Sequence, residues 1–483
     1  MKALVAELRR VVGARGLVLD PAERRTYESD GLKGYAVVPG LVVLPESAEQ
    51  VQEVVRACCA RGVPFVARGA GTGLSGGALP LEDGVLIALS RMRRILEIDT
   101  RNRLAVVEPG VSNLAVTEAA APHGLHYAPD PSSQVVCSIG GNVAENSGGA
   151  HCLKYGFTTH HVLGLEVVLP DGERVALGAM GVPEAAGYDL MGAFVGSEGT
   201  LGIVTKIALR LTRRPEAVRT LLASFGSTDA AGAAVSDVIA AGIVPAAAEM
   251  MDALSIQAAE AAVAAGYPAG AGAVLIVELD GPAAEVLEEL AAVEAICRRR
   301  GATELRLAAT DAERALMWKG RKSAFAAMGR ISVSYYVQDG VIPRSALSEV
   351  LARIAALAAE RGLRVANVFH AGDGNLHPLV LYDPGVPGQE AAAGELASEI
   401  LGICLDHGGS ITGEHGVGVD KKDAMPRMFA PPDLEAMHRL RCAFDPQGLC
   451  NPGKLFPTPR LCGERPGPHK PHPLVEAGVA DLF

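Results

Sequence analysis

Apolar residues change their spacing several times along the first part of the chain, and each spacing predicts a different element. The run 40–45 (GLVVLP) is short and continuous, which is typical of a buried strand. From Ser47 to Gly62 apolar residues recur every three or four positions, and Gln50 completes a capping-box pattern, so a helix is predicted. The run 64–68 (PFVAR) predicts the next strand. After an amphipathic N-terminal helix, the chain is therefore expected to begin with a β-α-β unit.

Three segments further along interrupt this periodicity because glycine, serine and asparagine dominate them: 68–80, 129–172 and 194–211. Residues 71–76 match the dinucleotide fingerprint G-x-G-x-x-G, but that fingerprint needs a helix directly after the glycines to hold a pyrophosphate. A turn and a strand pattern follow here instead, which disfavours a Rossmann domain and a nicotinamide dehydrogenase. Backbone N–H groups in glycine-rich loops can approach phosphates closely. The three segments therefore predict one extended ligand enclosed by backbone.

The character of the chain changes after 212–217 (TRRPEA), where alanine becomes frequent and strand and helix patterns alternate. This alternation predicts an α+β second domain. The proline-rich end, 458–483, is expected to be an extended tail. The predicted elements of the second domain are strands at 274–279, 335–340, 364–370 and 376–382 and helices near 229–241, 283–300, 344–361 and 389–407.

Size, charge and cysteine content restrict the function classes. The 483 residues exceed what one compact core holds, and the net charge of −11 argues against a general affinity for nucleic acid. The nine cysteines include no C-x-x-C pair, which argues against a disulfide framework and an iron–sulfur cluster and favours a reducing cytoplasm. Neither a signal peptide nor a membrane span is expected from the apolar runs.

Two short stretches of the second half carry the residue types of a catalytic centre: 370–377 (HAGDGNLH) and 412–418 (TGEHGVG). A Gly-Asp-Gly turn can bring His370 and His377 side by side on adjacent strands. Two imidazoles and one carboxylate form a partial ligand set for a divalent metal ion and leave positions open for a substrate. The alternative is that these histidines are only hydrogen-bonded within loops.

The glycine-rich and histidine-containing motifs, taken together and in this order, resemble those of a known family. The motifs are ARGAGTGLSGG, PDPSS with SIGGNVAENSGG, GSEGTLGIVT, GDGNLH, GEHGVG and FDPQGLCNPGKLFP. Over roughly residues 10–465 the chain resembles the FAD-linked oxidases of the vanillyl-alcohol oxidase type, and within them the branch of glycolate oxidase FAD-linked subunits and D-lactate dehydrogenases. The resemblance implies an α+β fold with a two-part FAD-binding domain and an α+β cap domain over the flavin. The domains expected from it are a helical leader (1–36), the FAD-binding domain (37–215), the cap (216–405), a closing C-terminal segment (406–457) and the tail (458–483).

The resemblance also implies which residues bind FAD, nearly all of them in the glycine-rich segments. Relatives that hold the flavin covalently use a histidine in the first loop, where this chain has Thr72, so the FAD is expected to be non-covalent. The predicted FAD-binding residues are Arg68, Gly69, Ala70, Gly71, Thr72, Gly73, Leu74, Ser75, Pro129, Asp130, Pro131, Ser132, Ser133, Ser138, Gly140, Gly141, Asn142, Ala144, Asn146, Gly148, Gly149, Tyr155, Glu198, Gly199, Ile203 and Asn451.

The same resemblance implies roles for residues of the second half. His370, His377 and Glu414 match the ligands of a divalent metal ion, zinc or a similar one. His415 matches the general base, a task for which an imidazole pKa of about 6.5 is suitable. Arg321, in MWKGRKSAF, matches the arginine that binds the substrate carboxylate; the alternative is an arginine on a surface helix.

Phe325 and Tyr336 stand where relatives that accept a second carboxylate carry threonine and lysine, so a small monocarboxylate is expected as substrate. The implied reaction is the FAD-dependent oxidation of glycolate to its 2-oxo acid. The alternatives are D-lactate as substrate and, from another class, a flavin subunit that only transfers electrons. The implied partners are an iron–sulfur subunit and a second FAD-type subunit at the inner face of the membrane. His407 and the pair His160 and His161 lack a carboxylate partner in sequence and are expected to be structural.

Overall fold

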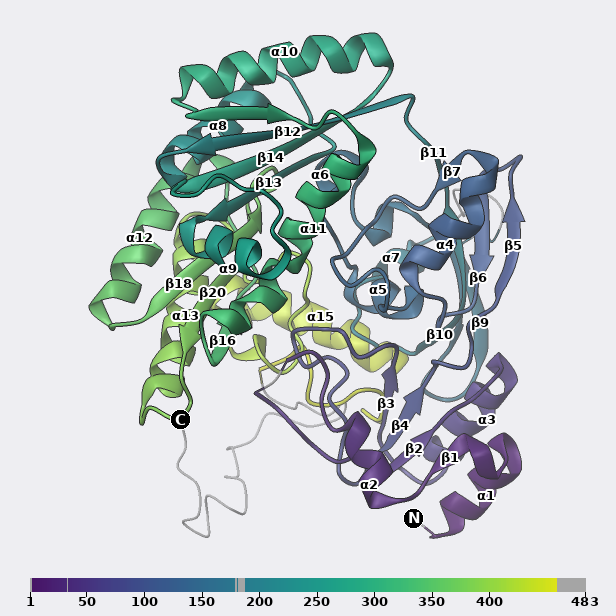
Figure 1. Cartoon of the computed structure of the whole chain (residues 1–483). Coiled ribbons are helices and arrows are strands. Elements are labelled where there is room, and N and C mark those ends of the chain that lie inside the picture. Colours follow the sequence, from purple (N-terminus) through teal and green to yellow (C-terminus); the bar gives the residue numbers. More distant parts are fainter. Residues whose placement is uncertain (1, 33, 179, 181–186, 458–483) are drawn as a thin grey trace.

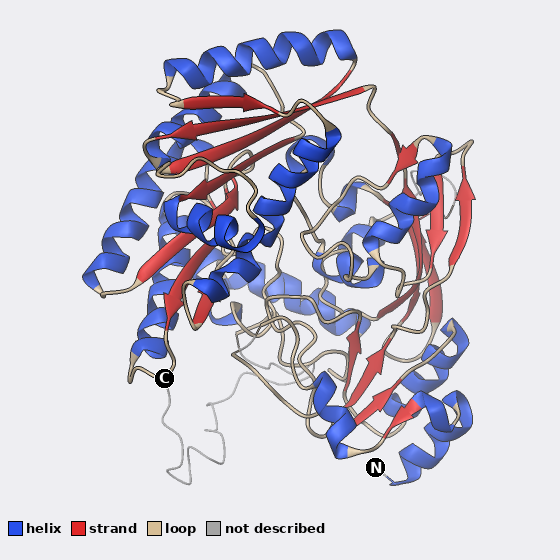
Figure 2. Ribbon diagram, viewed as in Figure 1, coloured by secondary structure: helices blue, strands red, loops and turns tan. Residues whose placement is uncertain are grey.

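The computed structural model describes residues 2–32, 34–178, 180 and 187–457 and consists of two parts that lie side by side (Figure 1). The first part contains two small sheets, and the second contains one large sheet with helices on both faces (Figure 2). The predicted tail at 458–483 lies outside the described residues. Among the described residues, no helix is both long enough and apolar enough to cross a bilayer.

The β-α-β unit predicted near the N-terminus is present as β2 (Leu41–Val43), α3 (Ala48–Cys59) and β3 (Phe65–Arg68). The Ser47 hydroxyl caps α3 by accepting a hydrogen bond from the Gln50 backbone N–H at 3.3 Å. No helix follows β3, because the chain runs through the first glycine-rich loop into a strand that lies between β2 and β3 and parallel to both. This confirms that the glycine pattern does not begin a Rossmann helix. The sheet is completed by β4 (Val85–Ala88) and β1 (Leu17–Val18), and α1 (Lys2–Val12) packs on α3.

The second sheet of the first part is antiparallel. The glycine-rich range 129–172 is not one continuous loop, because α5 (Ile139–Glu145), α6 (Cys152–Tyr155) and a strand lie within it. Gly140 stands in the first turn of α5, where a Cβ would approach the Pro109 Cβ to 2.6 Å. Glycine therefore permits close packing here rather than flexibility. The strands in spatial order are β5 (Ile95–Asp99), β6 (Leu104–Val107), β10 (Ile203–Arg210), β8 (Val162–Val168) and β9 (Arg174–Gly178).

The second part is built on a nine-stranded sheet with an apolar core on each face. One face carries the four helices that the sequence predicts, α8 (Thr228–Ala240), α10 (Ala283–Arg299), α12 (Leu347–Glu360) and α13 (Gln389–Asp406). The other face carries α9 (Ala253–Val263) and α11 (Asp311–Ala327), two helices that were not predicted from the sequence. The strands in order are β15 (Glu304–Leu307), β12 (Ala217–Phe225), β14 (Ala273–Gly281), β13 (Ala247–Asp252), β18 (Arg364–His370), β19 (Asn375–Leu376) and β17 (Gly340–Val341), with β20 (Pro378–Tyr382) beside β18 and β16 (Ser334–Val337) beside β20.

The last described segment returns to the first part after α15 (Pro431–Phe444), which lies between the two parts in Figure 1. The Phe65 N–H donates to the Leu449 carbonyl at 2.9 Å, and the Asn451 N–H donates to the Phe65 carbonyl at 2.8 Å. These bonds add the segment to the edge of the first sheet at β3. The remaining elements are the ribbon of β7 (Leu125–His126) and β11 (Thr212–Arg213) and the helices α2 (Pro21–Arg24), α4 (Asn113–Ala120), α7 (Leu190–Phe194) and α14 (Met425–Met428).

A network of largely buried charges joins the two parts. His151 in the first part has its Nδ1 3.0 Å from Asp130 Oδ1 and its Nε2 3.1 Å from Glu278 Oε1. The indole N–H of Trp318 donates a hydrogen bond to Glu278 Oε2 at 2.7 Å. Glu278 stands on β14 and Trp318 on α11, so the network fixes the second part against the first.

Charge and burial together set the protonation of this network. Desolvation alone would lower the pKa of His151, but the carboxylates of Asp130 and Glu278 outweigh it and raise that pKa to about 10. Desolvation would raise the pKa of Glu278, but hydrogen bonds from His151, Thr220 and Trp318 outweigh it and lower that pKa to about 2. Near neutral pH, an imidazolium therefore lies between two carboxylates.

We expect His151→Gln to reduce the free energy of unfolding by about 3 kcal/mol at about pH 6, because two buried carboxylates lose their shared partner. The pKa of His151 is raised on folding from 6.5 to about 10. Its contribution to stability is therefore fully present below pH 6.5 and is lost as pH rises towards 10. Chemical denaturation of both proteins between about pH 6 and 9.5 measures the difference, which should narrow as pH rises.

His123→Gln is the matched control, because His123 is an exposed histidine of the same part. This change should alter stability by less than about 0.5 kcal/mol at every pH. If the free energies of unfolding of wild type and His151→Gln differ by the same amount at every pH, the protein does not contain the charged network.

Candidate functional site

A cavity of about 450 Å³ lies where the two parts meet, a volume typical of cofactor and substrate sites. One wall is backbone from the first two glycine-rich segments, and the other consists of side chains from α11, β16 and the loop at 414–415. A second cavity of about 80 Å³ runs along the second and third glycine-rich segments. The two cavities share Gly69, Ala78, Ser138, Gly141 and Glu145, so together they form an elongated site of the kind a dinucleotide requires.

Two glycines of the first loop are required by close packing. A Cβ on Gly69 would lie 2.3 Å from Ser138 Oγ, and a Cβ on Gly71 would lie 2.2 Å from a guanidinium nitrogen of Arg68. Gly71 also has a φ of +71°, which residues with a Cβ adopt only at a cost. The first loop therefore lies directly on the second and presents its backbone to the cavity, an arrangement that suits phosphate groups.

The two cavities bring most of the predicted FAD-binding residues together. Arg68 supports the wall from behind, since its guanidinium donates to the Ser29 carbonyl at 2.7 Å. Tyr155 belongs instead to the interface of the two parts, where its hydroxyl donates to Asp280 Oδ2 at 2.5 Å. The predicted residues that line neither cavity are Arg68, Ser75, Pro129, Asp130, Asn146, Gly148, Gly149, Tyr155 and Asn451, and all the others line at least one.

Sequence reasoning missed part of the cavity wall. Gly31, Leu32 and Gly34 line the larger cavity, although they belong to the segment expected to be a helical leader. The Gly31 N–H donates to the Gly73 carbonyl at 2.9 Å and so attaches this segment to the first loop. The stretch 27–35 (YESDGLKGY) could have indicated that these residues form a loop, because it is polar, contains glycine and lacks the apolar periodicity of a helix.

The two histidine-containing stretches meet in the structure. His370 ends β18, His377 directly follows β19, and Glu414 stands in the loop after α13. Glu414 Oε1 lies 3.2 Å from His370 Nε2 and 3.4 Å from His377 Nε2. Ligand atoms of all three residues lie within 4.8 Å of one another, so the structure brings the three predicted metal ligands together.

A buried carboxylate orients His370. Glu249 on β13 stands directly opposite His370 on β18, so both side chains emerge on the same face of the sheet. Glu249 Oε1 lies 2.6 Å from His370 Nδ1, which leaves Nε2 directed at Glu414, as in histidines that bind metals. Desolvation would lower the pKa of His370, but Glu249 and Glu414 hold that pKa well above its usual value. A metal ion bound at Nε2 would displace the proton that the carboxylates of Glu249 and Glu414 retain on this ring.

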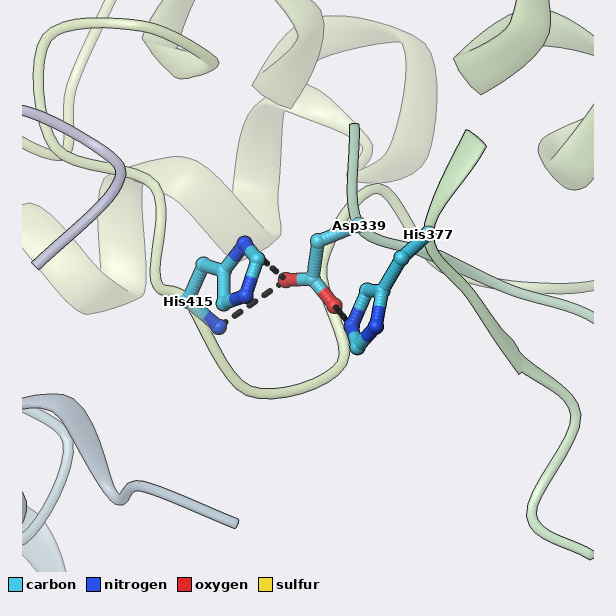
Figure 3. Close-up of side chains that lie close together, drawn as sticks. All are labelled: Asp339, His377 and His415. Carbon is cyan, nitrogen blue, oxygen red and sulfur yellow. Dashed lines mark hydrogen bonds and ion pairs between the residues drawn. The ribbon is translucent and has the colours of Figure 1, made fainter. Parts of the chain in front are cut away.

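A second carboxylate, Asp339, is fully buried and lies between His377 and His415 (Figure 3). Its pKa stays well below the usual value despite desolvation, chiefly because Lys421 Nζ lies 3.3 Å away. Asp339 also organises the loop that carries Glu414. The groups that donate hydrogen bonds to it are the backbone N–H groups of Gly413, Glu414 and His415, at 3.0, 3.2 and 2.9 Å, and the Thr412 hydroxyl, at 2.6 Å.

Two overlapping triads have the spacing of a metal site: His370, His377 and Glu414, and Asp339, His377 and His415. The second triad is less suited to bind a metal ion, because the carboxylate of Asp339 already accepts several hydrogen bonds. His377 is 2% exposed, and neither of its ring nitrogens makes a hydrogen bond of good geometry among the described residues. Its Nε2 lies 3.4 Å from Glu414 Oε1 and 3.5 Å from Asp339 Oδ1. Buried polar atoms are rarely left unpartnered, so the first triad fits a divalent cation with coordination positions open to the cavity.

His415 lines the cavity beside this triad. Its ring stacks on that of His377, with the ring centroids 5.0 Å apart and the planes 6° from parallel, and its Nδ1 lies 3.8 Å from Asp339 Oδ2. Burial lowers the pKa of His415 to about 4, although the carboxylate of Asp339 opposes this. The imidazole is therefore neutral near pH 7 and can accept a proton from a group in the cavity.

Arg321 lies one layer behind the cavity. It is 2% exposed, and its guanidinium nitrogen lies 2.6 Å from Glu249 Oε2. The residues of α11 that line the cavity are its neighbours Lys322, Phe325 and Ala326. Arg321 is buried, so the alternative of an arginine on a surface helix is wrong. The contact of Arg321 with the substrate carboxylate stays a prediction. Arg321 neutralises Glu249 and thereby supports the orientation of His370.

Sequence comparisons agree with this geometry. Residues 39–178 match the family described as FAD binding domain, and residues 214–455 match FAD linked oxidases, C-terminal domain. The chain is 53% identical over 446 residues to glycolate oxidase subunit GlcD of Escherichia coli (strain K12), which covers 92% of this chain and 89% of that one. It is 32% identical over 461 residues to D-lactate dehydrogenase of Anaerostipes hadrus, which covers 94% of this chain and 97% of that one.

The fold also has solved counterparts. The structure of 4-ethylphenol oxidase from Gulosibacter chungangensis superposes with a TM-score of 0.80 at 21% identity, over 95% of this chain and 97% of that one. At this identity the likeness concerns the fold alone, and it confirms the predicted FAD-binding domain with a cap. The match to the FAD binding domain supports FAD as the cofactor of the glycine-lined cavity. The chain belongs to the FAD-linked oxidases and has the two-part fold of the vanillyl-alcohol oxidase type.

Proposed function

We propose that this protein oxidises a small 2-hydroxy monocarboxylate, with glycolate as the preferred substrate, to the corresponding 2-oxo acid. The observation that carries the proposal is one cavity lined by glycine-rich loops, by two members of the metal-type triad, His377 and Glu414, and by the neutral His415. Two relatives, a glycolate oxidase subunit and a D-lactate dehydrogenase, have names that refer to substrates of this class.

Oxidation of R–CH(OH)–COO⁻ removes a hydride from the carbon and a proton from the hydroxyl group. FAD supplies the acceptor for the hydride when it is bound. His415 accepts the hydroxyl proton, because its imidazole is neutral and lines the cavity. Asp339 stabilises the imidazolium that results, since its carboxylate lies 3.8 Å from Nδ1.

His370, His377 and Glu414 would hold a divalent ion such as Zn²⁺, which would polarise the substrate hydroxyl as a Lewis acid. The protein prepares this site in advance. Glu249 fixes the ring of His370, and Asp339 fixes the loop of Glu414. The ligand atoms therefore already face one another, which reduces the reorganisation needed for binding.

The cavity wall around the triad favours one substrate carboxylate over two. The ring of Phe325 lies 5.7 Å from that of His377, and the hydroxyl of Tyr336 donates a hydrogen bond to Asp420. Neither an aromatic ring nor a phenol paired with a carboxylate offers a cation to a second substrate carboxylate, and burying that charge unpaired is costly. Dicarboxylates such as 2-hydroxyglutarate are therefore expected to be poor substrates.

D-lactate is the second substrate to consider, because one additional methyl group changes binding by only about 1–3 kcal/mol in a pocket. An alternative from another class is a flavin subunit that only transfers electrons. The buried triad and His415 speak against this alternative, since an electron carrier needs neither a metal ligand set nor a base.

We further propose that the electrons leave through partner subunits. The Escherichia coli relative is named as a subunit, and the cysteines of this chain lack the spacing of an iron–sulfur cluster. An iron–sulfur subunit and a second FAD-type subunit at the inner face of the membrane would complete the path.

We expect glycolate to bleach the flavin absorbance of the purified FAD-loaded protein without oxygen, D-lactate to do so more slowly, and L-lactate and D-2-hydroxyglutarate to be poorest. Stopped-flow absorbance measures the four rates. Thorough chelation should slow the reaction with glycolate by at least about 100-fold, and added Zn²⁺ should restore it, because the ion stabilises the developing alkoxide. Failure of all four acids would favour the electron-transfer subunit, and bleaching unchanged by chelation would exclude the metal role.

His377→Ala is expected to keep FAD but to weaken metal binding by at least about 100-fold, because one of three ligands is removed. Elemental analysis of dialysed protein gives the metal content, and absorbance gives the FAD content. His407→Ala is the matched control, since His407 lies outside the cavity and bonds to the Ile403 carbonyl. If His377→Ala retained the metal ion, the assignment of this ligand would be wrong.

A further inference from the structure

We propose that Glu145 and Glu198 share one proton beside the FAD site, and that FAD binds while Glu145 is a neutral carboxylic acid. Glu145 ends α5 and lines both cavities, and Glu198 lines the smaller one. The proposal goes beyond the proposed function, because it concerns the cofactor and holds whichever 2-hydroxy acid is oxidised. It adds to the cofactor site a residue, Glu145, that the sequence motifs did not single out.

The two carboxyl groups meet at Gly416, in the loop 412–418. A Cβ on Gly416 would lie 2.2 Å from Glu145 Oε2 and 3.0 Å from Glu198 Oε1. Glycine at this position therefore leaves the space in which the two oxygens come together. The other oxygen of Glu145 is directed at the first glycine-rich loop, since a Cβ on Gly77 would lie 2.5 Å from Oε1. Glu145 thus lies between its partner acid and the cavity wall that includes Gly77.

Hydrogen bonds distinguish the two acids. The backbone N–H groups of Val417 and Gly418 donate to Glu198 Oε1 and Oε2 at 2.6 and 2.7 Å. Glu145 Oε2, in contrast, is buried and has no hydrogen-bond partner among the described residues. N–H donors stabilise a carboxylate, whereas an ionised oxygen without donors is costly to bury. Glu198 is therefore the ionised member of the pair, and Glu145 is the member that holds the proton.

The charges around Glu145 favour the same assignment. The acids that face it are Glu198 and Asp30, and the cation that faces it is Lys421. Lys421 already lies 3.3 Å from the carboxylate of Asp339, so it offsets little of the negative charge at Glu145. Burial, and after it the carboxylates of Glu198 and Asp30, raise the pKa of Glu145 well above its usual value.

Glu198 lies in more favourable surroundings for a charge. Burial raises the pKa of Glu198 as well, but its two backbone N–H donors and the ammonium groups of Lys421 and Lys454 oppose the rise. The pair therefore titrates as a unit, with one proton held between its two acids near neutral pH.

The proton of Glu145 matters because FAD is an anion. Its pyrophosphate is negatively charged, and a flavin gains further negative charge when it accepts a hydride. Since Glu145 lines both cavities, a carboxylate at this position would repel the cofactor. The neutral acid removes this repulsion and leaves only the charge of Glu198, which its two N–H donors stabilise. Binding of FAD is therefore linked to the proton of Glu145.

Infrared spectra of the full-length FAD-bound protein measure this protonation directly. The difference spectrum between wild type and Glu145→Gln near neutral pH should contain the carbonyl band of a protonated carboxylic acid, which shifts in heavy water. Glu118→Gln is the matched control, because Glu118 is an exposed glutamate of the first part and lines neither cavity. Its difference spectrum should contain only carboxylate bands. If Glu145→Gln also removes carboxylate bands and no acid band, the proposal is overturned.

A fluorescence titration with FAD measures the link to cofactor binding. Near neutral pH, Glu145→Gln should bind FAD with a Kd within about threefold of wild type, because an amide replaces a neutral acid of similar shape. FAD binding should be strongest below the pKa of Glu145 and weaken as pH rises through it. Over the pH range in which the acid band disappears, the Kd of wild type should increase by about tenfold relative to that of Glu145→Gln.

The link to FAD is overturned if the ratio of the two Kd values stays constant while the acid band titrates. Neither measurement requires a substrate, so a failure of this proposal can be distinguished from a failure of the proposed oxidation of glycolate.

Discussion

Burial of charge is the constraint on which the site depends. Glu249 and Asp339 are 1% and 0% exposed, and carboxylates at this depth remain ionised only with cationic partners and hydrogen bonds. Arg321 supplies one partner at 2.6 Å and Lys421 the other at 3.3 Å. Because a cation compensates each carboxylate, Glu249 can orient His370 and Asp339 can orient His415. Loss of either cation would therefore disturb the chemistry of the site and not only its stability.

The two parts of the chain contribute different kinds of groups to the cavity. The first part supplies mostly backbone, since its glycines allow loops to lie on one another without side chains between them. The second part supplies side chains from neighbouring strands of one sheet and from α11. The network around His151 sets the distance between these two walls. The position of the two cavity walls relative to each other therefore depends on this network of charges between the two parts.

Site residues that lie close together in the sequence could be predicted from it, whereas residues that contact them from distant positions in the chain could not. The residues of the two histidine stretches lie within short motifs, so their type and spacing were informative. Their supports were missed: Glu249 is 121 positions from His370, and Asp339 is 75 positions from Glu414. Strand register places Glu249 opposite His370. The sequence indicates a buried functional role for Glu249 only by placing an acidic residue within the apolar run 247–251 (AAEMM). The side of α11 on which Arg321 stands could not be assigned, because the helix itself was not predicted.

We propose that the triad of His370, His377 and Glu414 binds a divalent cation next to the flavin. The most direct measurement is an anomalous difference map, recorded at the zinc absorption edge, from crystals of the FAD-bound protein grown with Zn²⁺. We expect one peak about 2.0–2.2 Å from His370 Nε2, a ring nitrogen of His377 and a carboxylate oxygen of Glu414. No peak at this position, or a peak coordinated by Asp339 and His415 instead, would show that the triad is not the metal site.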